Sequence, residues 1–514
     1  MEIIQDKALL LRLRDPHIVT STIPSSKAVG DNQVLVKWGF EEAAQLRQLK
    51  IKNVPSPILR DYVWPGLHQP FAHQKTTSSF LTLHKRAFCF NEQGTGKTAS
   101  VIWAADYLMT LGIVRRVLVI CPLSVMVSAW SRDLFTFAMH RTVDVAYGAT
   151  AKRAQIIESA AEFIVINYDG VDTVKDVLAK ANFDLIVVDE ANAYKNPQTK
   201  RWKTLNKLLK PETWLWMLTG TPAAQSPIDA YGLAKMVCPI NVPKFFTAFR
   251  DMVMYRVGQF KWEPKDTATD TVFRALQPAI RFTKDECLDL PDMLYVTRAL
   301  DMSAQQLKYY NSIKSTMSAT ASGETITAVN AGVAITKLLQ VACGAAYSDS
   351  GATVQFDVKA RFKVLQEIID ECKHKVLVFV PFKHTIEMLH DLTTAQGIES
   401  AIIDGGVSMT KRTAAFTRFQ DKTTPLKVLF IQPQAAAHGV TLTAADTVVW
   451  WGPTTSLETY AQANARAHRA GQSNKVTVVR LVGSPVEKRL YQLLDSKIDA
   501  HTQLVDLYKA VLDD

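Results

Sequence analysis

The chain lacks the sequence features of membrane, secreted and disulfide-rich proteins. No apolar run reaches the ~18 residues that a membrane span needs. Residues 1–7 do not show the basic and then apolar pattern of a secretion signal. The six cysteines are scattered and include no C-x-x-C pair, so we expect neither a zinc site nor a disulfide framework. We therefore expect a cytoplasmic protein with no membrane partner, or a nuclear one if the source is eukaryotic.

Low-complexity tracts and short repeats are also absent, and the composition is that of a globular protein. Hydrophobic residues make up 47% and charged residues 21% of the 514 positions, which is enough chain for roughly two to four domains. The formal net charge is +10. An excess of positive charge favours a polyanionic partner, although many basic proteins bind no nucleic acid.

Short runs of Val, Ile and Leu alternate with longer helical patterns along most of the chain, which is typical of parallel α/β layers. In the first half the predicted strands are residues 86–91, 117–121, 163–167, 185–189 and 214–219. In the second half they are residues 375–380, 401–404, 427–431, 447–451 and 476–481. The predicted fold class is therefore α/β, with two parallel-sheet lobes.

These patterns also predict a domain organisation. Residues 1–65 carry no recognisable motif and are expected to form an N-terminal accessory region. Residues 66–290 are expected to form the first lobe, with a helical insertion at about 225–290. Residues 291–358 should be a helical protrusion and linker, with helices at 303–317 and 325–342. Residues 359–514 are then the second lobe, which ends in a C-terminal helix.

A phosphate loop follows the first predicted strand of the first lobe. Glycines let the backbone approach a phosphate closely, and the N–H groups at the start of the following helix face it. Lys97 would reach the β- and γ-phosphates, and Thr98 would offer its hydroxyl to Mg²⁺. The other predicted nucleotide contacts are Gln93, Gly94, Thr95 and Gly96. The alternative is a tight strand–helix turn with a surface lysine.

An acidic pair ends a later apolar strand. Strand 185–189 delivers Asp189 and Glu190 to its carboxyl end, which is the ligand edge of a parallel sheet. Asp189 would hold Mg²⁺, and Glu190 would orient or deprotonate the attacking water. The alternative is a strand that ends in a solvated acidic turn.

A segment with two arginines lies near the C-terminus. On a helix, Arg466 and Arg469 would project from one face, with Gln462 one turn earlier. Arginines supplied from a second lobe would stabilise charge on a γ-phosphate and couple catalysis to closure of the lobes. Taken alone, the segment is more often a solvated basic helix.

Together these motifs resemble those of the SNF2-type ATPases of helicase superfamily 2, in the family's order and over about residues 68–495. The resemblance implies two RecA-like lobes with helical insertions, and it implies ATP and Mg²⁺ as cofactors. It assigns Gln74 to adenine recognition and Gly439 to the segment that links strand binding to the ATP site. It assigns DNA contacts to Pro122, Ser124, Asn167, Tyr168, Lys195, Asn196 and Thr441.

The function that the resemblance implies is ATP-driven translocation on double-stranded DNA. The segment around Gly439 and Thr441 resembles the fork-remodelling and strand-annealing branch, which implies branched DNA as a partner in replication, repair or recombination. A monomeric phage or bacterial protein, in a bacterial or infected-host cytosol, fits this branch. Two alternatives stay open: a strand-separating helicase on DNA or RNA, and a non-catalytic clamp that switches partners on binding nucleotide.

Two other stretches permit two interpretations each. Residues 200–203 with Lys207 and Lys210 form either a DNA-facing helix or a solvated helix with one packed tryptophan, and the second is favoured. Near the start, Arg12, Arg14, His17, Trp38 and the helix-like residues 41–50 either recognise branched DNA or belong to a brace that packs on the first lobe, and the brace is favoured.

Overall fold

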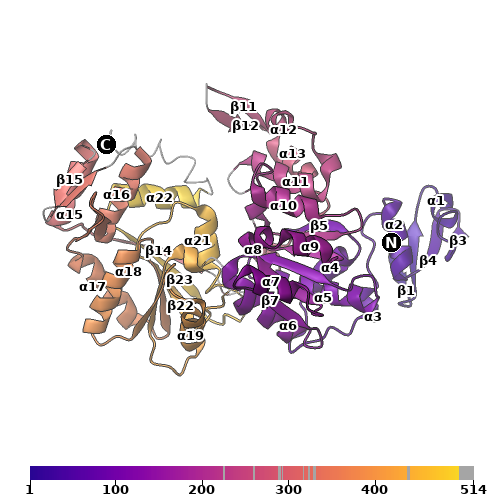
Figure 1. The fold of residues 1–514 in the computed structure, drawn as a ribbon, viewed down its shortest axis with the longest axis horizontal. Coiled ribbons are helices and arrows are strands. Elements are labelled where there is room, and N and C mark those ends of the chain that lie inside the picture. The colour runs from indigo at the N-terminus through magenta and orange to yellow at the C-terminus, as the bar shows by residue number, and fades with distance from the viewer. Residues whose placement is uncertain are drawn as a thin grey trace. The chain divides into compact units, whose positions relative to one another are not determined.

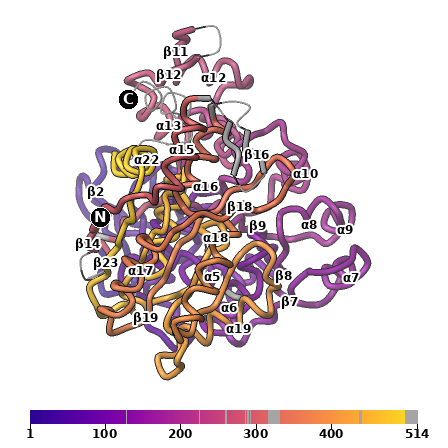
Figure 2. Tube along the Cα trace, turned by 90° about the vertical axis from the view of Figure 1, so that its left-hand side faces the viewer, coloured from indigo at the N-terminus to yellow at the C-terminus, as the bar shows by residue number. Residues whose placement is uncertain are grey.

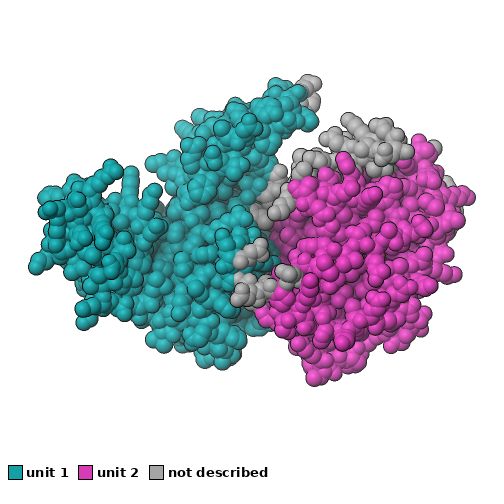
Figure 3. All heavy atoms as spheres, turned by 180° about the vertical axis from the view of Figure 1, so that it is seen from behind, with its two compact units in different colours: residues 1–287 teal, residues 288–514 magenta. Residues whose placement is uncertain are grey.

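Each half of the chain forms its own parallel β-sheet with helices on both faces (Figure 1). The computed structural model describes residues 1–220, 222–223, 226–258, 261–287, 291, 293–316, 318–321, 324–327, 331–436, 440–469 and 471–496. The two units are residues 1–287 and residues 288–514 (Figure 3). The predicted α/β class with two parallel-sheet lobes is confirmed. The finer boundaries predicted at residues 65, 225, 290 and 358 stay predictions.

The sheet of the first unit has seven parallel strands, and its central strands are fully or largely buried on both faces. In spatial order they are β13 (Ala279–Ile280), β5 (Arg86–Cys89), β10 (Trp214–Leu218), β9 (Leu185–Val188), β6 (Val117–Cys121), β8 (Phe163–Asn167) and β7 (Val143–Ala146). The five strands predicted in this half are confirmed to within two residues. The edge strands β7 and β13 are absent from the prediction.

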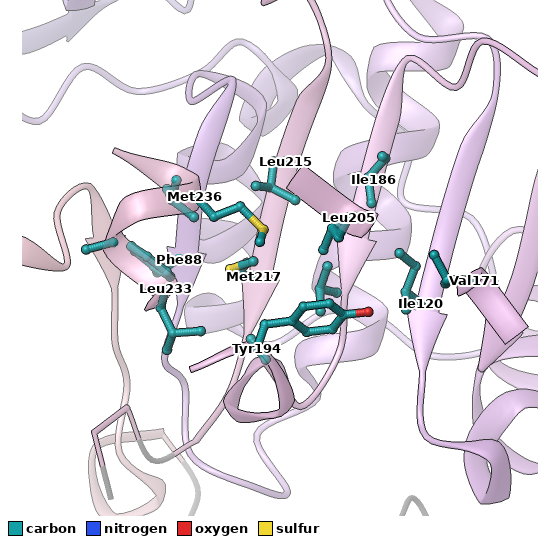
Figure 4. Packing of buried hydrophobic residues seen from close by; sticks show 14 of the residues in the cluster. Phe88, Ile120, Val171, Ile186, Tyr194, Leu205, Leu215, Met217, Leu233 and Met236 are labelled. Atoms are coloured by element: carbon teal, nitrogen blue, oxygen red, sulfur yellow. The ribbon is translucent and has the colours of Figure 1, made fainter. Parts of the chain in front are cut away.

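Alternate side chains of this sheet enter two separate cores. One core lies under α4 (Ala72–Thr82), α5 (Lys97–Thr110) and α6 (Arg132–Phe137). The other lies under α7 (Thr150–Ile157), α8 (Tyr168–Thr173), α9 (Lys175–Lys180), α10 (Lys200–Leu208) and α11 (Ala230–Val237). Figure 4 shows Leu205 of α10 and Met236 of α11 packed against the strands in this second core. Both faces are therefore closed by helices, and the strand ends are left for ligands.

Residues 1–65 contain a four-stranded antiparallel sheet with its own small core of buried residues, including Leu9, Val34 and Trp38. The sheet order is β1 (Glu2–Ile4), β2 (Ala8–Arg12), β4 (Gln33–Lys37), β3 (Ser26–Gly30), accompanied by α1 (His17–Thr20), α2 (Phe40–Gln48) and α3 (Ile58–Asp61). The segment after it packs Trp64 against Trp103 of α5, and Trp103 donates to the carbonyl of Pro65. These contacts favour the brace interpretation.

The insertion after α11 mixes helices with short strands. It contains α12 (Phe246–Val253), a hairpin of β11 (Met254–Arg256) and β12 (Trp262–Pro264), α13 (Ala268–Ala275) and α14 (Lys284–Cys287). The interpretation of residues 200–203 as a helix with one packed tryptophan is supported here, because Trp202 of α10 donates its indole N–H to the carbonyl of Gly232 in α11.

Residues 291–358 are less helical than predicted. The two expected helices are present as α15 (Ala304–Thr316) and α16 (Ala331–Cys343), which pack side by side (Figure 2). Their neighbours are strands: β14 (Met293–Ala299) and the hairpins of β15 (Ser318–Ala321) with β16 (Glu324–Thr327) and of β17 (Ala345–Tyr347) with β18 (Thr353–Gln355). The prediction of a mainly helical segment is wrong for β14. Its apolar residues 293–296 are followed by Thr297 and Arg298, and most of the strand is exposed because it lies at the sheet edge.

The sheet of the second unit has six parallel strands. Their order is β14, β23 (Val476–Val482), β22 (Ala445–Trp450), β19 (Lys375–Phe379), β21 (Val428–Ile431), β20 (Ser400–Ile403). One face packs on α17 (Lys359–Glu371) and α18 (Lys383–Ala395). The other packs on α19 (Met409–Gln420), α21 (Leu457–Asn464) and α22 (Pro485–Asp495). Within the described part of the chain, no helix combines the length and apolar character that crossing a membrane requires.

Candidate active site

The phosphate loop and the acidic pair lie at the same edge of the first unit's sheet. The loop follows β5 and the acidic pair follows β9, and β10 pairs with both strands in parallel. Ligands of open α/β sheets bind outside the carboxyl ends of the strands, where helices on opposite faces leave a crevice. The topology therefore gathers the two motifs, which are separated by about 90 residues in sequence.

The phosphate loop takes the backbone shape that its glycines permit. Gly94 and Gly96 have φ angles of 87° and 81°, which residues with a side chain rarely adopt. A Cβ at Gly96 would also meet the side-chain amide of Gln74, which would have to move away. Lys97, the first residue of α5, donates from Nζ to the carbonyls of Asn91 (2.8 Å) and Glu92 (3.2 Å). The loop thus places a cation beside backbone N–H groups, which fits a phosphate group.

Gln74 and Asn91 hold the loop from behind. Gln74 accepts a hydrogen bond from the backbone N–H of Phe71 and donates to the carbonyl of Thr95 at 3.3 Å. Asn91 stands where the usual loop pattern has glycine, and its buried side chain donates to the hydroxyl of Thr77 and accepts from the N–H of Phe282. The departure from the pattern therefore adds bonds that tie the loop to its surroundings. Thr98 is half-buried in the first turn of α5.

The acidic pair is positioned by strong local constraints. Asp189 accepts the N–H of Glu190 at Oδ1 and the indole N–H of Trp130 at Oδ2, at 3.0 and 2.9 Å. Glu190 has a left-handed φ of 47°, a strained value for a residue with a long side chain. Its Oε1 accepts from Gln93 of the phosphate loop at 3.3 Å. The two motifs are therefore in direct contact.

The residues present fit Mg²⁺ as a partner of bound phosphates. Among the described residues no group of three or more His, Cys, Asp or Glu could enclose a metal by itself. Mg²⁺ commonly takes one or two carboxylates and completes its shell with phosphates and water. Asp189 and the hydroxyl of Thr98 supply oxygen ligands of this kind, on the strand end and helix start that flank the loop.

The residues of the first unit that were predicted to contact DNA differ in their exposure and in their bonds within the protein. Pro122 is buried and Ser124 half-buried, whereas Asn196 is exposed in a turn where its side chain accepts from the N–H of Gln198. Lys195 forms an ion pair with Asp229 at 3.0 Å. These contacts stay predictions.

Asn167 and Tyr168 point inward. Asn167 accepts from the guanidinium of Arg153 at 2.8 Å. The hydroxyl of Tyr168 donates to the carbonyls of Asp189 and Glu190 at 2.6 and 3.2 Å. The sequence assigned no role to Arg153 or to the indole of Trp130. Since side-chain partners depend on which strands are neighbours, residue spacing gave no signal for either contact.

The arginine segment of the second unit is not helical, and the prediction that both arginines share one helix face is wrong. Helix α21 ends at Asn464, so Arg466 and Arg469 lie in the turns that follow. Beyond this end, the side chain of Gln472 donates to the carbonyls of Thr443, Ala445 and Ala467, which ties the turns to the chain at the start of β22.

The two arginines also differ in exposure. Arg466 is 6% exposed, whereas Arg469 is half-buried and donates to the carbonyl of Val440 at 3.2 Å. Gln462 is buried and donates to Glu458 at 3.2 Å. Thr441 is half-buried beside this segment, and Gly439 lies outside the described residues. The geometry therefore makes Arg469 the better candidate to reach a ligand.

A phosphate loop and an acidic pair on one parallel sheet, joined to a second parallel-sheet unit, define a two-lobed ATPase of helicase superfamily 2. The SNF2-related domain family matches residues 73–345, which is more than half of the chain. The helicase conserved C-terminal domain family matches residues 360–471. The chain therefore belongs to the SNF2-related family. SNF2-related ATPases use ATP.

Individual proteins with similar sequences belong to the same comparison. The chain is 27% identical over 440 residues to chromodomain-helicase-DNA-binding protein 1-like of Mus musculus, covering 81% of this chain and 47% of that protein. It is 26% identical over 420 residues to an uncharacterized ATP-dependent helicase of Mycoplasma genitalium, covering 79% of this chain and 39% of that protein. The chain thus spans less than half the length of these relatives.

A solved structure is also similar. It is the SWI2/SNF2 ATPase core of Sulfolobus solfataricus in complex with double-stranded DNA, with a TM-score of 0.42 and 21% identity over 87% of this chain and 95% of that one.

Proposed function

We propose that this chain is the motor core of an ATP-dependent double-stranded DNA translocase. The observation that carries the proposal is the contact between the phosphate loop and the acidic pair in the first unit, in a chain that matches the SNF2-related family. The second unit matches the helicase C-terminal family and contributes Arg466 and Arg469. Motion along DNA follows if the two units close on ATP and reopen after hydrolysis while they alternate their grip on the strand.

Each residue has a role in this proposal. Lys97 binds the β- and γ-phosphates, Gln74 supports adenine recognition, and Glu190 orients the water and takes its proton. Bound Mg²⁺ would neutralise charge on the phosphates, with Thr98 and Asp189 as its protein ligands. Arg469 would stabilise the charge that develops on the γ-phosphate. Gln462 and Arg466 would hold the segment that carries Arg469 in place.

The proposed DNA partner is a duplex, held mainly through its phosphates. The net charge of +10 supports this, because neutralising phosphates releases counterions and favours binding irrespective of sequence. The contacts proposed for the strand are Pro122, Ser124, Asn167, Tyr168, Lys195, Asn196 and Thr441. We extend the proposal to branched DNA in replication, repair or recombination, with a monomer as the working form.

One ATPase panel tests this function. Turnover is measured with no polymer and with single-stranded, duplex, forked and four-way DNA and RNA of matched length. We expect duplex-containing DNA to raise turnover at least about tenfold, and RNA to raise it far less; the stimulation should fall steeply with salt. Equal stimulation by DNA and RNA would contradict the DNA assignment, and highest turnover on four-way DNA would support the branched substrate.

A strand-separating helicase is the second candidate, because the Mycoplasma genitalium relative is named an ATP-dependent helicase. Both candidates hydrolyse ATP, but only a helicase separates the strands of a forked duplex. Displacement of a third strand from a triplex, without unwinding of a fork, supports the translocase. Unwinding of the fork at a comparable rate supports the helicase instead.

A further inference from the structure

Three neighbouring strands bring the acidic pair beside two segments that the family resemblance assigns to DNA. Strand β6 lies between β9 and β8, with Ile120 opposite Val188 and Cys121 opposite Asn167. The chain after β9 is the acidic pair, the chain after β6 is residues 122–131, and the chain after β8 begins with Tyr168. All three therefore leave the sheet at one edge, within reach of one another.

Trp130 connects the segment after β6 to Asp189. It lies in a π-helical turn, Met126–Ser131, a rare conformation that occurs often at functional sites. Its side chain is 1% exposed, and its indole N–H donates to Oδ2 of Asp189 at 2.9 Å. An indole N–H has one hydrogen to give, so a rotation of this turn moves or releases the carboxylate.

Tyr168 connects the segment after β8 to the same pair. Its hydroxyl donates to the backbone carbonyls of Asp189 and Glu190, while the guanidinium of Arg201 lies 4.9 Å from the centre of its ring. These bonds fix the turn in which Glu190 has its strained positive φ.

We infer that Trp130 and Tyr168 are positioning residues through which DNA held by their two segments changes the affinity of the acidic pair for the nucleotide and its metal. The inference rests on the proposed function, because it requires DNA at these segments. Neither side chain needs to touch nucleotide. Each acts by holding a carboxylate oxygen or a carbonyl in the turn that carries Asp189 and Glu190.

Two variants remove the two donors: the first replaces the indole with a smaller phenyl ring, and the second keeps the phenyl ring of the tyrosine. Trp130→Phe deletes the indole N–H, and Tyr168→Phe deletes only the hydroxyl. The same first unit offers matched controls. Trp216, fully buried, donates its indole N–H to the carbonyl of His84, and Tyr231 donates its hydroxyl to the carbonyls of Pro243 and Lys244. Trp216→Phe and Tyr231→Phe thus lose the same bonds and packing at places that do not contact the acidic pair.

The measurement is an equilibrium one. The dissociation constant of a fluorescent, non-hydrolysable ATP analogue with Mg²⁺ is determined with and without saturating duplex DNA, and the ratio of the two values is the coupling between the sites. We expect at least about fivefold coupling in the unaltered protein and in both controls. In Trp130→Phe and in Tyr168→Phe the ratio should fall to within about twofold of one.

Coupling that survives in both variants would overturn the inference, because a purely structural role lowers affinity equally with and without DNA. Coupling that is lost in the controls as well would overturn it too, since general loosening would then be the cause. If the unaltered protein binds duplex DNA but its affinity for the ATP analogue does not change, the inference is also contradicted. The proposed function is then still decided by the ATPase measurements with different polymers. A wild-type protein that binds no duplex contradicts the proposed function itself.

Discussion

At the scale of single residues, Lys97 shows how the phosphate loop is prepared for a ligand. Its amino group donates to two carbonyls of its own loop, so a phosphate has to replace these bonds. A charged phosphate oxygen is the stronger acceptor, because a charge-assisted hydrogen bond is roughly twice as strong as a neutral one. Affinity for nucleotide should therefore depend strongly on this one side chain.

Lys97→Ala should weaken nucleotide binding by roughly 10- to 100-fold, which corresponds to the ~1.5–3 kcal/mol of a hydrogen bond to a charged group. Titration of a fluorescent ATP analogue measures this change. Lys85→Ala is the control, since Lys85 is an exposed lysine just before β5, at the opposite end of the strand from the loop. Equal affinities for Lys97→Ala and the unaltered protein would remove Lys97 from the nucleotide site.

Glu190→Gln should separate binding from chemistry. The amide keeps the size of the side chain but cannot take a proton, so nucleotide affinity should stay within about threefold while turnover falls at least about 100-fold. Binding and steady-state hydrolysis are measured on the same preparation. Unchanged turnover would show that another group activates the water.

The identity of these residues could be predicted from sequence, but their partners could not. The spacing of glycines, lysine and acidic residues carries the chemistry of the motif wherever the motif occurs. The bond from Trp130 to Asp189 depends instead on β6 and β9 being neighbours. Likewise, the bonds from Gln472 to the carbonyls of Thr443 and Ala445 join residues that are far apart in sequence, so they leave no local pattern.

At the scale of elements, burial decides which strands the sequence reveals. Strands β6, β8 and β9 are buried along their whole length, so each is a continuous apolar run that pattern analysis finds. Strand β14 pairs with β23 along seven residues and yet is mostly exposed, because it lies at the sheet edge. The small N-terminal sheet was missed for the same reason: its strands are partly or mostly exposed, and none is buried along its whole length.

The end of α4 supplies a prediction on pH. The ring of His84 is 6% exposed, its Nδ1 lies 2.6 Å from the carbonyl of Phe80, and its Nε2 has no hydrogen-bond partner among the residues that the structure describes. Burial, opposed in part by that bond and reinforced by nearby Arg47, lowers the pKa of His84 to about 4. The folded state therefore favours the neutral ring, and protonation favours unfolding.

The neutral His84 ring should make its full contribution to the free energy of unfolding above pH 6.5, the pKa of histidine in the unfolded chain. This contribution should be lost as the pH falls towards 4, the pKa in the folded state. Between about pH 7.5 and about pH 5 the expected loss is about 2 kcal/mol. Denaturant unfolding at several pH values, compared with His84→Gln, measures it. The variant should show a shallower decline over this interval. Parallel curves for the two proteins would rule out His84 as the cause.

At the scale of the whole molecule, the proposed function assigns one part of an ATPase site to each of the two units. Lys97, Asp189 and Glu190 belong to the first unit, and Gln462, Arg466 and Arg469 belong to the second. An arginine supplied by the other lobe makes hydrolysis depend on closure, which is how a nucleotide cycle becomes movement. The central claim is that both units act on one triphosphate while the chain holds duplex DNA.

The most direct test is the turnover of Arg469→Ala with saturating duplex DNA. Arg469 is half-buried and Arg489 of α22 is exposed, so Arg489→Ala is the control in the same unit. We predict that Arg469→Ala lowers DNA-stimulated turnover about 10³-fold with nucleotide affinity in the first unit retained, and that Arg489→Ala changes neither. Turnover of Arg469→Ala within about threefold of the unaltered protein would contradict the claim that the second unit completes the active site.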